Sequence, residues 1–414
     1  MNHIFIWIIS FLAIAGVIIR PFKVTEAVYA VSGALLLLIF QLIRPSEALT
    51  GIGKGQDVYL FLTGMMLLAE TAREEKLFDW LAAHATIRAK GSSGRLFLLI
   101  YLVGVLITTF LSNDATAVVL TPAVAAAVKA AKVKNPLPYL LICAFIANAA
   151  SFVLPISNPA NLVIYGKHMP PLLHWLGQYL IPSVCSITAT YFMLRFTQRS
   201  CFKEKIITGI DLSELSPGGK TALYGICGTA VILLASSAFN IQLGLPTAIT
   251  GIVTTIIVLS RAKKSPVTII KGISWAILPL VAGLFVLVEA LNKTGLTQQL
   301  TLLLDHAVAR SQTAAVWASG SVIAVACNLM NNLPAGLIAG NVLQSGHTPE
   351  IVKSAVLIGV DLGPNLSITG SLATILWLVA LRREGLEVSA WTFLKLGSVV
   401  MTVALGITIL SLHV

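Results

Sequence analysis

Residues 96–128 decide the fold: LFLLIYLVGVLITTFLSNDATAVVLTPAVAAAV is an apolar segment without Lys or Arg, interrupted at its centre by Leu111-Ser112-Asn113-Asp114. A helix that spans a bilayer takes about 20 residues, so the segment is too long for one upright helix and too short for two. Arg95 precedes the segment and Lys129 follows it, so both flanks are expected on the cytoplasmic side. The sequence therefore predicts a re-entrant hairpin with a polar tip deep in the membrane.

The composition supports a membrane environment for the whole chain. Of the 414 residues, 57% are hydrophobic and 11% are charged, and the mean hydropathy is +0.89. Soluble domains carry roughly 25% charged residues, so this chain lacks the charge needed to cover a water-facing surface. The net charge of +11 comes from residues spread over short loops, which indicates membrane orientation and no nucleic-acid partner. We expect an all-α polytopic membrane protein surrounded by lipid.

Three further segments contain polar interruptions. Residues 311–352 are expected to form a second hairpin, with its break at Asn331-Asn332-Leu333-Pro334 and its flanks outside the cell. Residues 140–165 and 354–381 contain Asn, Pro and Gly in apolar surroundings, and we expect each to form a broken helix. Unwound backbone is tolerated at membrane depth only where it is buried in protein or lines a cavity.

The remaining apolar runs predict upright spans near 4–19, 24–43, 57–70, 179–195, 221–239, 246–260, 274–289 and 396–412. With the two broken helices these make about ten spans, which fits a chain of this length. In this topology 22 Lys and Arg residues lie inside and six lie outside, and both termini are external.

A weak internal repeat indicates two inverted halves. At an offset of 219 residues Gly64 and Glu70 match Gly283 and Glu289, and at 213 residues Asn148, Ser157 and Asn158 match Asp361, Gly370 and Ser371. Inverted repeats are typical of secondary transporters. We predict an amino-terminal repeat over 1–195, a cytoplasmic linker over 196–220 and a carboxy-terminal repeat over 221–414.

Two acidic residues, Asp114 and Asp361, are expected at mid-membrane depth. A carboxylate there is costly and usually faces a cavity, a proton path or a bound ion, although capping of a half-helix is an alternative role. Asn113, Asn148, Asn158, Asn332 and Asn365 bring amides to the same breaks, and Asn328 belongs to one of these clusters. We find no buried Lys or Arg to hold an anion, which favours a neutral polar solute or a cation as substrate.

Three stretches carry a resemblance to a known family. They are Phe110 to Pro122 (FLSNDATAVVLTP), Met330 to Pro334 (MNNLP) and Asp361 to Trp377 (DLGPNLSITGSLATILW). Over essentially the whole chain the sequence resembles the ArsB-type arsenite efflux permeases of the ion-transporter superfamily. The Asn-Asp hairpin motif is shared with sodium/proton antiporters and carboxylate transporters. The run from Gly-Pro to Gly-Ser-Leu-Ala-Thr is the more specific sign of resemblance to the arsenite permeases.

The resemblance implies proton-coupled export of arsenite and antimonite across the bacterial inner membrane, in some members with a cytoplasmic ATPase subunit. It implies hairpins whose tips meet at the midplane. By motif, the substrate-binding residues would be Asn113, Asn148, Ser157, Asn158, Asn331, Asn332, Asn365, Thr369 and Ser371, with Asp114 and Asp361 coupling protons. Asn148 departs from the family pattern, because some relatives carry an acid there.

Other functions remain open at this point. A sodium/proton antiporter of the same superfamily is the main alternative, and sodium-dependent proton movement unaffected by arsenite would favour it. An enzyme is not expected, because HExxH, GxSxG and GxxxxGK[ST] are all missing, and we predict no cofactor. Arsenic(III) binds thiolates, but only Cys143 and Cys327 lie near the expected site, so direct thiol binding is not expected.

Overall fold

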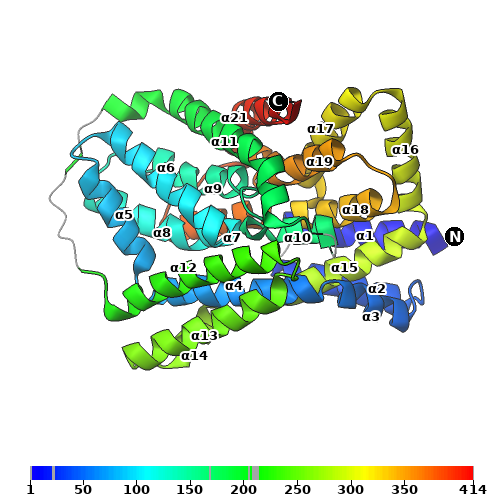
Figure 1. Cartoon of the computed structure of the whole chain (residues 1–414), viewed down its shortest axis with the longest axis horizontal. Coiled ribbons are helices and arrows are strands. Elements are labelled where there is room, and N and C mark those ends of the chain that lie inside the picture. Colours follow the sequence, from blue (N-terminus) through cyan, green and yellow to red (C-terminus); the bar gives the residue numbers. More distant parts are fainter. Residues whose placement is uncertain (1, 21–23, 167–168, 204–205, 208–213, 414) are drawn as a thin grey trace.

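The computed structural model describes residues 2–20, 24–166, 169–203, 206–207 and 214–413, and the regular elements within these ranges are all helical (Figure 1). The first half contains α1 (Asn2–Ile19), α2 (Glu26–Ile39), α3 (Pro45–Lys54), α4 (Gln56–Glu74), α5 (Leu77–Arg88), α6 (Ser93–Phe110), α7 (Asn113–Ala115), η2 (Thr116–Leu120), α8 (Thr121–Ala130), α9 (Leu137–Ala149), η3 (Pro155–Ser157), α10 (Pro159–Tyr165) and α11 (Leu172–Thr197).

The remaining elements are η5 (Arg199–Lys203), α12 (Pro217–Ala238), α13 (Gly244–Ala262), α14 (Pro266–Gly272), α15 (Ile277–Lys293), α16 (Leu296–Arg310), α17 (Gln312–Met330), α18 (Asn332–Ser345), α19 (Glu350–Leu362), η6 (Gly363–Leu366), α20 (Leu372–Arg383), α21 (Ala390–Leu410) and η7 (Ser411–His413). Parts of the predicted linker, 204–205 and 208–213, lie outside the described residues.

Six stretches of the described chain are long and apolar enough to cross a membrane. They are Ser93–Phe110, Pro217–Ala238, Gly244–Ala262, Pro266–Lys293, Gln312–Met330 and Ala390–His413, and shorter apolar helices cover His3–Ile19, Glu26–Ile39 and Leu137–Ala149. Each of the eight predicted upright spans coincides with a helix. The all-helical membrane fold is therefore confirmed, whereas the count of about ten crossings stays a prediction.

At several helix crossings small residues are buried while large apolar residues of the same helix are exposed, a pattern typical of helices in lipid. On α13 the buried face includes Gly251 and Thr255, and the opposite face exposes Ile252 and Ile256. A Cβ at Gly64 of α4 would overlap the backbone of α13 at Thr247, so the two helices cross in close contact. α15 crosses α2 in the same way, because a Cβ at Gly283 would lie 2.7 Å from the Ala30 carbonyl carbon.

Both predicted hairpins are present as a helix, a break and a returning helix. α6 ends at Phe110 and the chain turns at Leu111 and Ser112 before α7, η2 and α8 continue. α17 ends at Met330, and Asn331 breaks the helix with a φ of 73° before α18 begins. In Figure 1 the first hairpin (cyan) and the second (yellow to orange) enter the molecule from opposite ends.

Both predicted broken helices are also present. α9 ends at Ala149 and η3 separates it from α10, while α19 ends at Leu362 and η6 separates it from α20. The order of elements from α4 to α11 then recurs from α15 to α21: two helices, a hairpin, a broken helix and a long helix. The inverted orientation of the two halves and their exact limits stay predictions.

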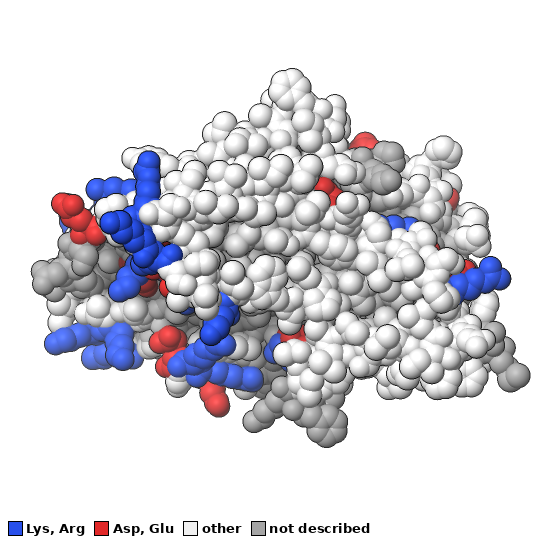
Figure 2. All heavy atoms as spheres, turned by 90° about the horizontal axis from the view of Figure 1, so that it is seen from below, with Lys and Arg blue, Asp and Glu red and all other residues white. Residues whose placement is uncertain are grey.

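The charges gather at one end of the molecule. On the face that Figure 2 shows, most of the visible Lys and Arg side chains lie at the end where Figure 1 places α5, the start of α12 and the end of α13, with few at the opposite end. We call these the basic end and the opposite end. The positive-inside rule describes this kind of asymmetry, and it predicts that the basic end faces the cytoplasm.

Candidate substrate site

The break between α9 and α10 meets α19 through one amide and one carboxylate. Asn158 caps α10 by accepting a hydrogen bond from the backbone N–H of Ala160 at 3.0 Å. Its Nδ2 donates to Oδ1 of Asp361 at 2.7 Å. Asp361 is completely buried, and its other oxygen, Oδ2, has no hydrogen-bond partner among the described residues. Half of this carboxylate is therefore left unsatisfied inside the protein.

The second break meets α9 in a related way. Asn148 Nδ2 donates to Asn365 Oδ1 at 3.0 Å and to Thr374 Oγ1 at 3.2 Å. Asn365 in turn donates to the carbonyl of Phe145 at 3.0 Å, and Ser371, which caps α20, lies 2.9 Å from Thr374 Oγ1. Asn148 Oδ1 is a second buried acceptor for which the described residues provide no partner.

In each of these two clusters, a residue from one half of the chain bonds to a residue from the other half. Asn158 caps α10 and Ser371 caps α20, the second parts of the two broken helices. The offset of 213 residues matches these two positions with each other. Asn158 bonds directly to Asp361, whereas Ser371 and Asn148 both bond to Thr374, and the same offset matches Asn148 with Asp361. At one pair of corresponding points, position 361 and position 148, the two breaks differ by a carboxylate in place of an amide.

The tip of the second hairpin is bonded to the break beside it. The backbone N–H of Asn332 donates to the Gly370 carbonyl at 2.9 Å, and Asn331 Nδ2 lies 3.5 Å from the Thr369 carbonyl. Thr369 Oγ1 donates back to the hairpin, to the Asn328 carbonyl, at 3.1 Å. The expected residues Asn331, Asn332 and Thr369 are therefore brought together.

Asn328 is a residue that the predicted site omits. Its Nδ2 donates to the Gly363 carbonyl at 2.9 Å, and its Oδ1 accepts from Ser367 Oγ at 2.7 Å. It lies one helical turn before Asn331 and Asn332, and this spacing of three and four residues was the signal available in the sequence. Asn328 ties the last turn of α17 to both ends of η6.

The first hairpin contacts its own break through Ser157, whose Oγ donates to the Thr109 carbonyl at 3.0 Å. Asn113 is buried, and its Oδ1 accepts the backbone N–H of Asp114 at 2.9 Å. Asp114 itself is half-buried and lines a cavity of about 60 Å³ together with Ser112 and Pro159. Asp114 thus faces this cavity, beside the first residue of α10.

The hairpins touch the broken helices of both halves. α7 and η2 pack on α20, and α18 packs on α10. Within the described residues, no hydrogen bond joins Asp114 to Asp361 or Asn113 to Asn332. The structure therefore arranges the predicted residues as four groups around the two breaks, and each hairpin contacts a break directly.

The two cysteines near the site are buried. Cys327 Sγ lies 3.8 Å from the Val360 carbonyl, and Cys143 is inside α9. No group of three or more His, Cys, Asp or Glu side chains that could hold a metal ion occurs in the part of the chain that the structure describes. The site offers amide, hydroxyl and carboxylate oxygens.

The fold combines helices that have apolar outer faces with two hairpins and two broken helices that contain buried polar residues. These features define a polytopic membrane transporter. Residues 6–359 match the family described as CitMHS, citrate transporter, and the chain belongs to this family. It is 27% identical over 354 residues to the arsenical pump membrane protein of Yersinia enterocolitica, with 82% of each chain covered. It is 25% identical over 398 residues to the arsenical pump membrane protein of Escherichia coli (strain K12), with 92% of each covered.

Two solved structures share the fold. The YdaH transporter of Alcanivorax borkumensis superposes with a TM-score of 0.56 at 16% identity, over 88% of this chain and 86% of that one. MtrF of Neisseria gonorrhoeae, described as one of a class of antimetabolite efflux pumps, superposes with a TM-score of 0.52 at 14% identity, over 91% and 84%. The family and the fold together make the chain an integral membrane transporter of the ArsB and CitMHS type.

Proposed function

We propose that this transporter exports arsenite and antimonite from the bacterial cytoplasm across the inner membrane, in exchange for protons. The observation that carries the proposal is the set of unpartnered buried acceptors at the breaks: Asp361 Oδ2, Asn148 Oδ1 and Asn161 Oδ1. Arsenious acid is neutral at pH 7 and carries three hydroxyl groups that donate hydrogen bonds. A neutral solute with several hydrogen-bond donors supplies the hydrogen bonds that these oxygens lack.

The same region is unsuited to citrate. A tricarboxylate is held in proteins by Arg and Lys, which supply charge-assisted hydrogen bonds. Among the described residues no Lys or Arg is buried, and the buried ionisable residues other than cysteine and tyrosine are Glu26, Glu70, Glu75 and Asp361. The names of the bacterial relatives, arsenical pump membrane proteins, point to the same substrate class.

Proton coupling is assigned to Asp114 and Asp361. Asp361 contacts the cap of α10, and Asp114 lines the cavity beside the start of α10, so both carboxyl groups adjoin the same half-helix. Gain and loss of a proton at either group would change the hydrogen bonds it offers to the substrate. Alternating access then follows from movement of the hairpins relative to the breaks they contact.

Everted vesicles carrying an imposed proton gradient test the proposal. We expect the wild-type protein to accumulate arsenite without ATP, and Asp114→Asn and Asp361→Asn to lose gradient-dependent accumulation while inserting normally. Asp79→Asn, which alters an exposed carboxyl group on α5, is the matched control and should retain transport.

Sodium is included as a competitor in the same vesicles. If arsenite stays out while sodium collapses the gradient, the protein is a sodium/proton antiporter and the proposed substrate is wrong. Accumulation that requires added ATP and a cytoplasmic ATPase subunit would contradict coupling by the gradient alone.

A further inference from the structure

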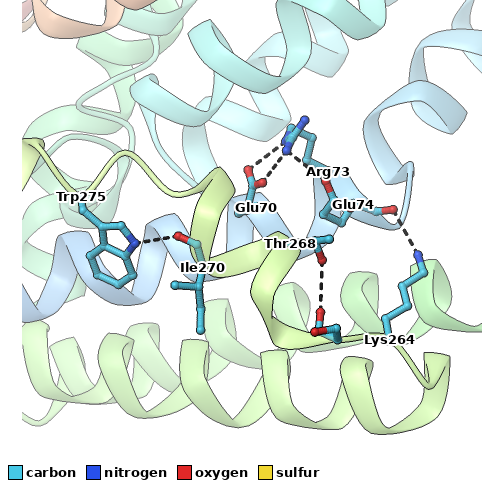
Figure 3. A network of polar contacts seen from close by, with 8 residues as sticks. Glu70, Arg73, Glu74, Lys264, Thr268, Ile270 and Trp275 are labelled. Atoms are coloured by element: carbon cyan, nitrogen blue, oxygen red, sulfur yellow. Dashed lines mark hydrogen bonds and ion pairs between the residues drawn. The ribbon is translucent and has the colours of Figure 1, made fainter.

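One buried carboxylate, Asp361, has no cationic partner among the described residues. The other three, Glu26, Glu70 and Glu75, each form an ion pair with an Arg or Lys side chain. Figure 3 shows one of these pairs, in which Arg73 Nε donates to Glu70 Oε2 at 2.8 Å. A nearby cation stabilises the charged form of a carboxylate, whereas a buried carboxyl group without one gains and loses a proton more readily. A proton that binds to Asp361 has to reach it through the protein.

A cavity of about 690 Å³ lies at the end of α10. Its wall also includes the start of α11, the connection between α12 and α13, the end of α18 and the start of α19. The start of α12 and the end of α13 lie at the basic end, so this cavity, at the other ends of the same helices, is on the side expected outside the cell (Figure 1). We call it the outer cavity. The titratable residues in its lining are Asp57, Tyr165, His174, Glu350 and Lys353.

Two tyrosine hydroxyl groups lead from the outer cavity into the protein. The hydroxyl oxygens of Tyr165 and Tyr179 lie 2.6 Å apart, and either group can be the donor. Tyr165 lines the outer cavity, whereas Tyr179 is completely buried and its ring packs against Trp175 and Phe152. A hydroxyl oxygen can accept one proton while the group releases another. The pair can therefore pass a proton inward from the cavity and end in its starting form.

α19 leads from the tyrosine pair to Asp361. Glu350 and Lys353, near the start of this helix, line the outer cavity. Ser354 is buried and lies beside the Tyr179 hydroxyl group. Asp361 follows seven residues after Ser354, which places it on the same face of the helix, about 10 Å further along. The helix face that meets the tyrosine pair therefore also carries the carboxyl group.

The next turn of α11 brings further hydroxyl groups to this region. Ser183 is buried, and its Oγ has no hydrogen-bond partner among the described residues. Ser186 Oγ, on the same face, donates to the Ala149 carbonyl at 2.8 Å, so this part of α11 lies against the first break. Ser151 of that break lies beside the carboxyl group of Asp361, whose Oδ2 also lacks a partner. Unsatisfied buried polar groups are the usual binding places of ordered water.

We propose that Tyr165, Tyr179 and the buried serines beside them form the path by which protons move from the outer cavity to Asp361. The inference rests on the proposed function, because it takes Asp361 as a group that couples protons. At each step an oxygen accepts one proton and releases another, and ordered water completes the path between the serine hydroxyl groups and the carboxyl group. Protons then enter from the side opposite the basic end, which is the direction that exchange with an exported substrate requires.

Two transport assays in everted vesicles test the path, with the outer cavity facing an acidified lumen. Tyr179→Phe removes the hydroxyl group and keeps the ring. We expect the initial rate of gradient-driven arsenite accumulation to fall about tenfold or more in this variant. Exchange of labelled for unlabelled arsenite at equal pH should stay near the wild-type rate, because exchange moves no net proton. A purely structural role of Tyr179 would lower both rates together.

Tyr165→Phe should show the same separation of the two rates. The double variant should be no slower than the slower single variant, because the two hydroxyl groups act in series. Tyr101→Phe is the matched control: this buried tyrosine donates to the Ile187 carbonyl of α11 at 2.6 Å, and it does not line the outer cavity. Both rates should stay near those of the wild type in the control.

The outcomes separate this inference from the proposed function. Arsenite accumulation that is equal in wild type and in both phenylalanine variants would overturn the path and leave the proposed function standing. Equal losses of accumulation and exchange in Tyr179→Phe, or a selective loss of accumulation in Tyr101→Phe, would also overturn the path.

The same vesicles keep the path testable if the substrate is wrong. If sodium moves protons and arsenite does not, sodium-driven proton movement should be about tenfold or more slower in Tyr179→Phe, and equal rates would overturn the path. Wild-type vesicles in which neither solute moves protons would overturn the path and the proposed function together.

Discussion

At the scale of single residues, the two oxygens of Asp361 differ in their surroundings: one accepts from Asn158 and the other has no partner among the described residues. Asn158→Ala should remove the first contact and the cap of α10, and lower the free energy of unfolding by about 1–3 kcal/mol. Thermal unfolding of the purified protein in detergent measures this loss.

A double-mutant cycle checks that the loss comes from the pair. In the Asp361→Asn background, Asn158→Ala should cost less than it does alone, because the buried carboxylate no longer depends on it. Equal costs in both backgrounds would show that Asn158 acts only as a helix cap.

Asn328 gives a second residue-scale prediction. Asn328→Ala removes the contacts to Gly363 and Ser367 that tie the second hairpin to η6, so it should lower stability by about 1–3 kcal/mol and reduce transport. Asn341→Ala, on the returning helix of the same hairpin, is the control and should have a small effect on both. Melting curves and arsenite accumulation in vesicles provide the measurements.

The sequence indicated which residue types lie at the breaks, but not how they pair. Asn and Asp within apolar runs are recognisable because hydrocarbon cannot bond their polar groups, and Pro and Gly because they interrupt helical backbone. The bond between Asn158 and Asp361, 203 positions apart, depends on how the halves pack. Asn328 is missing from the predicted site because its contacts, with the Gly363 carbonyl and the Ser367 hydroxyl, depend on packing against a segment 35 to 39 positions further along the chain.

At the scale of helices, the crossing of α4 and α13 depends on Gly64. Gly64→Ala places a methyl group against the α13 backbone at Thr247 and should destabilise the protein by roughly 1–3 kcal/mol. Gly228→Ala on α12 is the control, because its Cβ would meet nothing within 4 Å. A melting temperature that falls equally in both variants would mean that close approach is not the cause.

The connection between α3 and α15 should respond to pH. Lys293 Nζ donates to Glu47 Oε2 at 2.7 Å, and with the backbone N–H of Arg44 it holds the pKa of the Glu47 carboxyl below 4.5. Since the folded-state pKa is the lower one, the stabilisation is present above 4.5 and is lost as the pH falls through the folded-state pKa.

Glu47→Gln tests this contribution. The difference in melting temperature between Glu47→Gln and wild type should be small but measurable near pH 7 and should shrink below pH 4.5. A difference that grows on acidification would contradict the assignment.

Most helices, hairpins and breaks followed from the apolar runs, whereas four connecting helices did not. α3, α5, α14 and α16 are absent from the predicted spans because polar residues interrupt their apolar pattern. In α16, Gln298, Gln299 and Asp305 divide the run, and Thr301 is its one buried residue. Their structure is determined by neighbouring helices that the sequence pattern does not reveal.

At the scale of the whole molecule, the end rich in Lys and Arg should face the cytoplasm (Figure 2). Cys201 lies in η5 at this end and is partly exposed, so an impermeant thiol reagent should label it in everted vesicles. In a cysteine-free protein, Ser46→Cys on α3 should be labelled only in intact cells or right-side-out vesicles. The reverse pattern would invert the predicted topology.

The Asp361 carboxylate, which has an amide at the matching point of the other break, has a thermodynamic consequence. If the halves were chemically identical, the inward-facing and outward-facing conformations of an inverted-repeat transporter would have equal energy. Asp361 stands where the other half has Asn148, so an ionisable group is among the differences that make the two energies unequal. We therefore expect the empty transporter to prefer one of the two conformations, and protonation of Asp361 to change that preference.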